Sequence, residues 1–408
     1  MSSQNLFFAL DLGSHSVKGA LANIDTKSRV VDVIAKAEAR SQGIRRGIIF
    51  DVEDASRAIG DVLRQLEESS KKEINQVNIL LGGPCLETRF AKGSILTSRP
   101  DEEIGQEDER RIQETIETLP TPQNRTVLHV IPQYYLIDDI DKVKQVVGMR
   151  GSRLTLEATV IDVFSQAVLG MNKSLGIVGL HSGLIAANPL ATAKALVPKR
   201  DREQGVCAID FGAETTSITV FEEDNLSYLS VIPLGSQNIT NDIANALQVH
   251  FDTAERIKLG FGQAMASKIS KKEEIEMSRF AEGEESTVSK KYLAEIIEAR
   301  VSEILEFVNA ELKKLGKAGK LPGGAVIYGG GANLPHLNQL VKKELKLSVR
   351  KANFDHLRNY FPEDVSPQFF SVYGLILWQM ESVFGSRTDS FGSGLSGIFK
   401  KVWDIFVP

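Results

Sequence analysis

The sequence of 408 residues is poor in several features that would assign it to a simple class of protein. It has two cysteines, Cys85 and Cys207, and neither belongs to a Cys-x-x-Cys or Cys/His cluster, so neither a disulfide framework nor a zinc site is indicated. No apolar run approaches the ~18 residues of a membrane-spanning helix, and the first residues lack the basic flank and apolar stretch of a signal peptide. We therefore expect the chain to stay in the cytoplasm.

A strong excess of charge of one sign is also missing. Lys and Arg number 48 against 53 Asp and Glu, which gives a formal net charge of −5. Because clustered positive charge is what attracts a polyanion, nucleic acid is not expected as a partner. Gly-x-Ser-x-Gly and Walker A motifs are absent and the six histidines are scattered, so hydrolase triads, P-loops and histidine metal sites lack support.

What the sequence does contain is one supersecondary unit in two copies. Each copy has two short apolar runs on either side of a polar turn that contains glycine, which predicts strand, tight turn, strand. The first copy covers 6–24 and the second 206–221, and they align Asp11 with Asp210. A repeat at this distance predicts two related lobes in an α/β protein.

The remaining segments predict elements around these two units. Asp51 is expected to cap a helix, and residues 85–164 predict a small α+β insert. The stretch 268–291 mixes both charges with Gly and Ser and is interpreted as a solvated loop. An apolar stripe over 293–312 predicts a helix packed on a core.

The two turns carry residues suited to a polyphosphate bound with Mg²⁺. Such a ligand needs backbone N–H donors at close approach, and an aspartate at a strand end can hold metal-bound waters. Asp11 and Gly13 supply both, and Lys18 on the returning strand can reach the phosphates. A single Asp-x-Gly turn is weak evidence, because hairpins favour Asp and Gly for backbone reasons. The second copy, at Asp210 and Gly212, strengthens the interpretation.

A third element lies late in the chain. Residues 325–328 predict a strand that ends in Gly329, Gly330 and Gly331 before a helix near Pro335. Bare backbone of this kind lets a flat base approach closely. Two Asp-Gly hairpins followed by a strand, three glycines and a helix are the layout of the actin-like ATPase superfamily, which includes actin, sugar kinases and DnaK-type chaperones.

Within that superfamily the sequence resembles the bacterial cell-division protein family FtsA. The resemblance spans nearly the whole chain and rests on motifs outside the phosphate turns. These are Gly43-Ile44-Arg45-Arg46-Gly47, Val127-Leu128-His129-Val130-Ile131-Pro132-Gln133 with Tyr135 and Asp138, Val147-Gly148-Met149-Arg150-Gly151, Asp242-Ile243-Ala244, and Ala254-Glu255-Arg256-Ile257-Lys258.

The resemblance implies an actin-like two-lobe α/β fold with duplicated RNase H-like cores, an FtsA-type insert called 1C and a C-terminal amphipathic helix. The implied subdomains are 1A at 1–84, continued at 163–204 and about 365–384, 1C at 85–162, 2A at 205–246, continued at about 305–364, and 2B at 247–304. A flexible linker at 385–393 and a membrane-targeting helix at 394–408 follow.

The resemblance also implies ATP and Mg²⁺ as ligands of the cleft between the lobes. Asp11 and Asp210 would hold Mg²⁺ through water. The residues that match the family's nucleotide contacts are Asp11, Gly13, Ser14, Ser16, Lys18, Asp210, Gly212, Glu214, Thr215, Gly235, Glu255, Lys258, Gly329, Gly330 and Gly331.

The second phosphate loop departs from the family pattern. The family commonly has Asp-x-Gly-Gly-Gly-Thr-Thr-Asp, whereas this chain has Ala213 and Glu214 for two glycines and Ser217 for the last aspartate. Ser236 likewise stands where a second glycine is usual. A carboxylate at Glu214 would repel the terminal phosphates unless Mg²⁺ or a rotamer turns it aside. We therefore expect ATP binding with weak or negligible hydrolysis.

The partners implied by the resemblance are the C-terminal peptide of the tubulin-like FtsZ, further copies of the chain in a filament, membrane lipid, and other division proteins through the 1C insert. The basic residues Arg300, Lys290 and Lys291 would receive the acidic and apolar FtsZ peptide. The implied location is the inner face of the cytoplasmic membrane at the division septum, as a peripheral protein.

The tail after the Gly/Ser linker predicts an amphipathic helix at a headgroup boundary. Its expected membrane-contacting residues are Leu395, Ile398, Phe399, Lys400, Lys401, Val402, Trp403 and Phe406. The alternative is a last helix docked on the body of the protein.

Two other functions share the core fold. One is the FtsA-like component of type IV pilus assembly, and the other is a small-molecule kinase of the same superfamily. No kinase-specific motif occurs, and a kinase would leave the insert and the tail unexplained. The segment Leu128–Gln133 and the terminal amphipathic helix favour FtsA over the pilus component.

Overall fold

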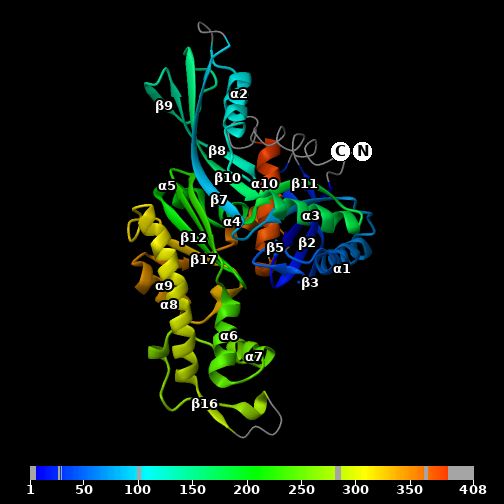
Figure 1. Ribbon diagram of the computed structural model, residues 1–408, viewed down its shortest axis with the longest axis vertical. Coiled ribbons are helices and arrows are strands. Elements are labelled where there is room, and N and C mark those ends of the chain that lie inside the picture. Colours follow the sequence, from blue (N-terminus) through cyan, green and yellow to red (C-terminus); the bar gives the residue numbers. More distant parts are fainter. Residues whose placement is uncertain are drawn as a thin grey trace.

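The computed structural model describes residues 6–25, 28, 30–98, 103–280, 286–362 and 366–384. Two lobes, each built on a five-stranded sheet, form the middle of an elongated molecule (Figure 1). A smaller four-stranded sheet lies at one end, and a mainly helical region at the other. The linker at 385–393 and the membrane helix at 394–408, both expected from the sequence, lie outside the described residues.

The first lobe carries a sheet in the order β11-β6-β1-β2-β3. Its strands are β1 (Leu6–Leu12), β2 (Ser16–Asp25), β3 (Val30–Arg40), β6 (Gln76–Leu81) and β11 (His181–Ala187). Strands β1, β2 and β3 are antiparallel, whereas β6 and β11 run parallel to β1. Helix α1 (Val52–Ser70) begins at Asp51, whose carboxylate accepts the amide of Asp54 at 3.0 Å, which confirms the expected cap.

The second lobe repeats this arrangement with the order β14-β13-β12-β17-β18. Its strands are β12 (Val206–Phe211), β13 (Thr216–Glu222), β14 (Asn225–Ile232), β17 (Ala325–Tyr328) and β18 (Val349–Lys351). Again the first three strands are antiparallel and the last two are parallel to the first. The two predicted hairpins are therefore the starts of two equivalent sheets, as the repeat indicated.

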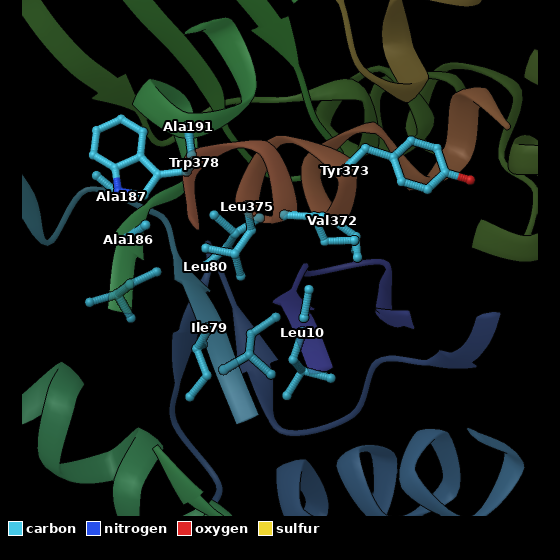
Figure 2. Packing of buried hydrophobic residues seen from close by; sticks show 14 of the residues in the cluster. Leu10, Ile79, Leu80, Ala186, Ala187, Ala191, Val372, Tyr373, Leu375 and Trp378 are labelled. Carbon is cyan, nitrogen blue, oxygen red and sulfur yellow. The ribbon is translucent and has the colours of Figure 1, made fainter. Parts of the chain in front are cut away.

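The last described helix returns from the second half of the chain to the first lobe. This helix, α10 (Phe370–Phe384), packs on α4 (Asn188–Leu196) and on β1, β2 and β6. Leu375 and Val372 of α10 lie among Leu10, Leu80 and Ala187 in the core of the first lobe (Figure 2). The remaining helices of the lobes are α3 (Ser165–Ile177), α5 (Lys199–Gln204), α9 (Leu337–Leu345) and the short turns η3 (Gly330–Asn333), η4 (Asp355–Asn359) and η5 (Pro367–Phe369).

The insert has a sheet and a core of its own. Its sheet order is β7-β10-β8-β9, from β7 (Leu86–Leu96), β8 (Arg125–Ile137), β9 (Asp141–Val143) and β10 (Arg153–Phe164). Helix α2 (Gln106–Glu117) covers this sheet and buries Ile112 and Ile116 against Leu154 and Leu156. Strand β10 continues past the expected boundary at 162, to Phe164.

The insert contacts both lobes. On the first lobe, Nε2 of the buried His129 accepts the amide of Ala187 at 3.0 Å. On the second lobe, the hydroxyl of Tyr134 donates to Glu223 at 2.6 Å, and Nζ of Lys144 donates to the Glu223 carbonyl at 2.5 Å. Gln133 also donates to the backbone of the second lobe. The insert therefore lies across the junction between the lobes.

The helical region contains α6 (Ser236–Leu247), α7 (Phe251–Phe261), α8 (Lys290–Lys314), the short strands β15 (Glu274–Glu276) and β16 (Thr287–Ser289), and the turns η1 (Ala266–Lys268) and η2 (Met277–Arg279). The apolar stripe of α8 is buried, as expected. The interpretation of 268–291 as a solvated loop is wrong in part, since β15 and β16 pair there. Ile275 and Met277 are buried in the core of this half of the molecule, so apolar packing accompanies the strand pairing in a charged segment.

Two smaller strands complete the first lobe, β4 (Ile44–Arg45) and β5 (Ile48–Ile49), which pair as a hairpin. None of the described helices is both long and apolar enough to cross a membrane.

Candidate functional site

Two acidic residues end the central strands of the two sheets. Asp11 is opposite Lys18 in the β1–β2 pairing, and Asp210 is opposite Ser217 in the β12–β13 pairing. Burial raises the pKa of Asp210 to about 7, and the nearby charge of Asp11 adds to this effect while Lys18 opposes it. Burial also raises the pKa of Asp11. The duplicated turns therefore bring two carboxylates together at the junction of the lobes.

The carboxylate of Asp11 is held by two residues that the sequence analysis did not single out. Asn188, at the start of α4, donates its side-chain amide to Oδ1 at 2.9 Å. Ser371, on α10, donates its hydroxyl to Oδ2 at 2.5 Å. These bonds fix the carboxylate from elements far away in the sequence, and no local pattern around Asn188 or Ser371 indicates this role.

The two turns have the same internal geometry. A Cβ at Gly13 would lie 2.8 Å from the carbonyl oxygen of Ser16, and a Cβ at Gly212 would lie 2.8 Å from that of Thr215. Both glycines are therefore required by the tightness of the turn rather than by φ. In the second turn the amide of Gly212 donates to Thr215 O at 2.9 Å, which closes the loop.

Lys18 lies beside the pair of carboxylates on β2. Its Nζ is 3.9 Å from Oε1 of Glu38 on β3, and its charge lowers the pKa of both Asp11 and Asp210. Glu38 is a weak competitor at this distance and exposure. The lysine thus remains available as a point charge for an anion near the two aspartates.

The glycines of the third element pack against the turn that contains Asp210 and Gly212. Gly329 has a φ of 87°, and a Cβ there would lie 2.1 Å from Oδ1 of Asp210. A Cβ at Gly331 would lie 3.1 Å from Cβ of Phe211, whereas Gly330 faces open space. Any side chain at position 329 would therefore displace Asp210, which explains the glycine at this position.

The start of α6 packs against the second turn. A Cβ at Gly235 would lie 2.5 Å from the carbonyl of Ala213, and the amide of Ser236 donates to Gly212 O at 2.9 Å. Lys258, on α7, donates to Thr240 at 2.7 Å and pairs with Glu255 at 2.7 Å. The sequence-predicted residues 235, 255 and 258 therefore meet around the first turns of α6.

The side chain of Glu214 is bonded to the first lobe. Its Oε2 accepts the backbone amide of Arg46, on the opposite lobe, at 2.5 Å. Arg46 belongs to the Gly43–Gly47 motif, and the next amide, that of Gly47, donates to Oγ of Ser14 at 3.0 Å. A rotamer thus turns the carboxylate towards a backbone donor, one of the two possibilities that the sequence left open.

Arg300 lines a second site, away from the cleft. A pocket of about 480 Å³ between α6 and α8 is lined by Asp242, Asn245, Ala246, Ile296, Ala299, Arg300 and Glu303. Arg300 donates Nε and Nη2 to the two carboxylate oxygens of Asp242, at 2.5 and 2.9 Å, and Nη1 to Glu303. The guanidinium is therefore already paired by two carboxylates.

Lys290 and Lys291 are not part of that pocket. Lys290 begins α8 and its Nζ is 3.3 Å from Oε2 of Glu273, while its charge lies 5.5 Å from the ring centre of Phe261. Ten residues of helix separate it from Arg300, a rise of roughly 15 Å. The structure does not bring the three predicted basic residues together at one point.

Comparison with known proteins assigns the family. Residues 207–374 match the family described as Cell division protein FtsA, and residues 87–162 match the SHS2 domain inserted in FtsA. The cell division protein FtsA of Bacillus subtilis (strain 168) is 30% identical over 92% of this chain and 84% of its own length. The chain belongs to the FtsA family. The FtsA protein of Borreliella burgdorferi is 29% identical over 98% of this chain and 100% of its own length.

Solved structures show the fold of this chain to be actin-like. A chain of the PilM–PilN type IV pilus biogenesis complex superposes with a TM-score of 0.64 at 16% identity, over 92% of this chain and 98% of that one. MreB5 of Spiroplasma citri bound to ADP superposes with a TM-score of 0.54 at 13% identity, over 93% and 98%. At these identities the likeness concerns the fold alone, and the FtsA family assignment rests on the sequence matches.

Proposed function

We propose that this FtsA-family chain binds ATP with Mg²⁺ between its lobes, assembles into filaments on the cytoplasmic face of the membrane, and tethers FtsZ there during division. The observation that carries the nucleotide site is the convergence of the two duplicated turns, with Asp11 and Asp210 side by side. Family membership supports the role in cell division.

The residues around the cleft fit a Mg²⁺–triphosphate ligand. Asp11 and Asp210 are oxygen donors of the kind that Mg²⁺ prefers, and two carboxylates suit a metal held largely through water. Within the described ranges no group of three or more His, Cys, Asp or Glu side chains could hold a metal ion directly. The close turns at Gly13 and Gly212 offer backbone amides, and Lys18 offers a positive charge, to the phosphates.

The nucleoside would lie towards the glycines of the third element. Gly330 faces open space, so a flat base can approach its backbone there. Glu255 and Lys258 lie at the side of the cleft formed by α6, where they would contact the ribose. We expect slow or negligible hydrolysis, because Ser217 provides a hydroxyl where the family commonly has a carboxylate.

The pocket at Arg300 supports the proposed FtsZ site. It combines an arginine with the apolar side chains of Ile296 and Ala299, which suits a peptide with acidic and apolar residues. A peptide carboxylate would have to replace Asp242 or Glu303 on the guanidinium. Lys290 and Lys291 would meet only a longer peptide that follows α8 towards its first turn.

Membrane attachment is assigned to residues 394–408, and contacts with other division proteins to the 1C insert. Many weakly binding tails along one filament would together attach that filament to the membrane, since each bound tail raises the effective concentration of the next.

The test is co-sedimentation of the full chain with anionic liposomes, with and without Mg²⁺–ATP and an FtsZ C-terminal peptide. We expect ATP to increase pelleting and the peptide to pellet only with the protein. If the amount of protein that pellets is the same with and without both ligands, the proposal is contradicted.

A further inference from the structure

One hydrogen bond crosses the cleft between the phosphate loop of the second lobe and a hairpin of the first. Glu214 accepts the amide of Arg46 at 2.5 Å, although 168 positions separate the two residues. The hydrogen bond is exposed, so both water and ligands can reach it. A backbone amide bonded to a carboxylate is a charge-assisted hydrogen bond, which is stronger than a bond between neutral groups.

The hairpin that supplies this amide is a tight turn packed against the first lobe. Arg46 and Gly47 are the two residues between β4 and β5, and their φ values are 50° and 73°, as a type I′ turn requires. A Cβ at Gly83 would lie 2.1 Å from the carbonyl oxygen of Arg46, so the turn packs directly on the backbone after β6. The direction of the Arg46 amide is therefore fixed by the fold of the first lobe.

The same turn also contacts the first phosphate loop. The amide of Gly47 donates to Oγ of Ser14 at 3.0 Å. Two consecutive amides of one turn thus bond the two phosphate loops, one on each lobe. We propose that Glu214 is a latch that closes the nucleotide cleft by bonding the second phosphate loop to the Arg46 turn.

The latch rests on the proposed nucleotide binding and concerns its regulation. A ligand held between two lobes enters and leaves when the lobes part, and parting must break the bond between Glu214 and Arg46. The Glu214 carboxylate therefore slows nucleotide exchange, because its bond to Arg46 must break first. The same bond turns the negative charge of Glu214 towards a backbone N–H group. A glycine at this position, as the family commonly has, cannot make this bond.

Two variants of Glu214 separate the effect of the hydrogen bond from that of the charge, and a third variant is a control. Glu214→Ala removes both, whereas Glu214→Gln keeps an acceptor oxygen for Arg46 and removes the charge. Glu222→Ala is the matched control, because Glu222 bonds Lys317 and Ser227 within the second lobe. Circular dichroism and thermal melting establish that each variant is folded.

The first measurement is hydrogen exchange of the Arg46 amide in the ligand-free protein. We expect Glu214→Ala to speed this exchange by about tenfold, the effect of losing one charge-assisted hydrogen bond at an exposed site. Glu214→Gln, which keeps a weaker neutral acceptor, should exchange within about threefold of the wild type, and Glu222→Ala should be indistinguishable from it. Equal protection of Arg46 in the wild type and Glu214→Ala would overturn the latch, whether or not nucleotide binds.

The second measurement is the dissociation rate of a fluorescent ATP analogue with Mg²⁺. We expect about tenfold faster dissociation from Glu214→Ala and a change within about threefold for Glu214→Gln. Equal acceleration in both variants would mean that charge rather than the bond controls exchange, and would contradict the proposal. If the wild type binds no analogue, the nucleotide proposal fails, and the exchange of the Arg46 amide still decides the latch.

Discussion

Asp11 and Asp210 occupy equivalent positions in the two lobes, and the charge of Asp11 helps to raise the pKa of Asp210. Each ends the central strand of a five-stranded sheet and lies next to a turn closed by a glycine. Their environments differ in one respect, since Asp11 is bonded by Asn188 and Ser371, and Asp210 is packed by Gly329. The two aspartates thus occupy equivalent backbone positions, but different contacts hold their side chains.

Replacing Asp210 should weaken nucleotide binding. Asp210→Ala removes one of the two oxygen donors for metal-bound water, so we expect at least about a tenfold loss of affinity for Mg²⁺–ATP. A titration with a fluorescent ATP analogue measures it. Asp32→Asn, at an exposed position on β3, is the control and should bind as the wild type does. Unchanged affinity in Asp210→Ala would remove this residue from the site.

ATP turnover by the wild type should be slow. Ser217 stands opposite Asp210 and provides no carboxylate for a general base. We expect the steady-state rate of phosphate release, measured with a coupled assay, to stay well below about 1 s⁻¹, which is the low end of common enzyme turnover numbers. A rate at or above that value would show that the substitutions in the second loop do not impair hydrolysis.

The pairing of Arg300 predicts opposite effects of two variants on binding of the FtsZ peptide. Asp242→Asn leaves Arg300 with a weaker partner, so peptide affinity should rise severalfold. Arg300→Glu places a third carboxylate beside Asp242 and Glu303. It should lower the affinity for the FtsZ peptide by tenfold or more, which is about the contribution of one hydrogen bond to a charged group. Fluorescence anisotropy at low salt measures both.

Lys290→Glu is the matched control for that experiment. Because Lys290 lies outside the pocket, its replacement should change peptide affinity by less than about threefold. A loss equal to that of Arg300→Glu would mean that the peptide runs along α8 to its first turn.

Residues 394–408 should carry membrane binding. A truncation that ends at Gly385 and the variant Trp403→Glu are both expected to remain in the supernatant with anionic liposomes while still binding ATP. Fully burying a side chain such as Leu or Phe contributes roughly 1.5–3 kcal/mol, and two lysines about 1 kcal/mol each. An interfacial helix buries only part of each side chain and must be ordered on binding, which makes a single tail marginal. If the truncated form pellets as well as the full chain, the helix docks on the body instead.

His129 should make the protein acid-sensitive. Burial lowers its pKa from 6.5 to about 4, so the folded protein takes up the proton less readily than the unfolded chain. Its full contribution to stability is present above pH 6.5 and is lost as the pH falls through about 4, for a total of about 3 kcal/mol. Urea unfolding at pH 7 and pH 4.5 should show a smaller loss for His129→Gln. His250→Gln, at an exposed histidine, should lose as much as the wild type.

The duplicated hairpin could be predicted because local sequence patterns specify it. Short apolar runs and an Asp-Gly turn specify a hairpin wherever they occur, so both central strands followed from the sequence. The partners of Asp11 did not, since Asn188 and Ser371 reach it only through the packing of α4 and α10 on the first lobe. Serine on an apolar helix gives no signal for such a role.

The direction of the Glu214 side chain was likewise not predictable. The sequence places a carboxylate in a phosphate loop, and only the position of the Arg46 turn in the other lobe decides where it points. The basic residues of α8 show the opposite case, because helical rise alone separates Lys290 from Arg300, and family resemblance had grouped them together.

Strand β13 joins the second of the two duplicated turns to the segment of the second lobe that the insert contacts. The strand starts at Thr216, directly after the second phosphate turn, and ends at Glu222, next to the residue that Tyr134 and Lys144 of the insert hold. It is seven residues long and fully extended between these two ends. The residues that the insert contacts and the turn that carries Glu214 therefore lie at the two ends of one strand, which β12 and β14 bond along its length.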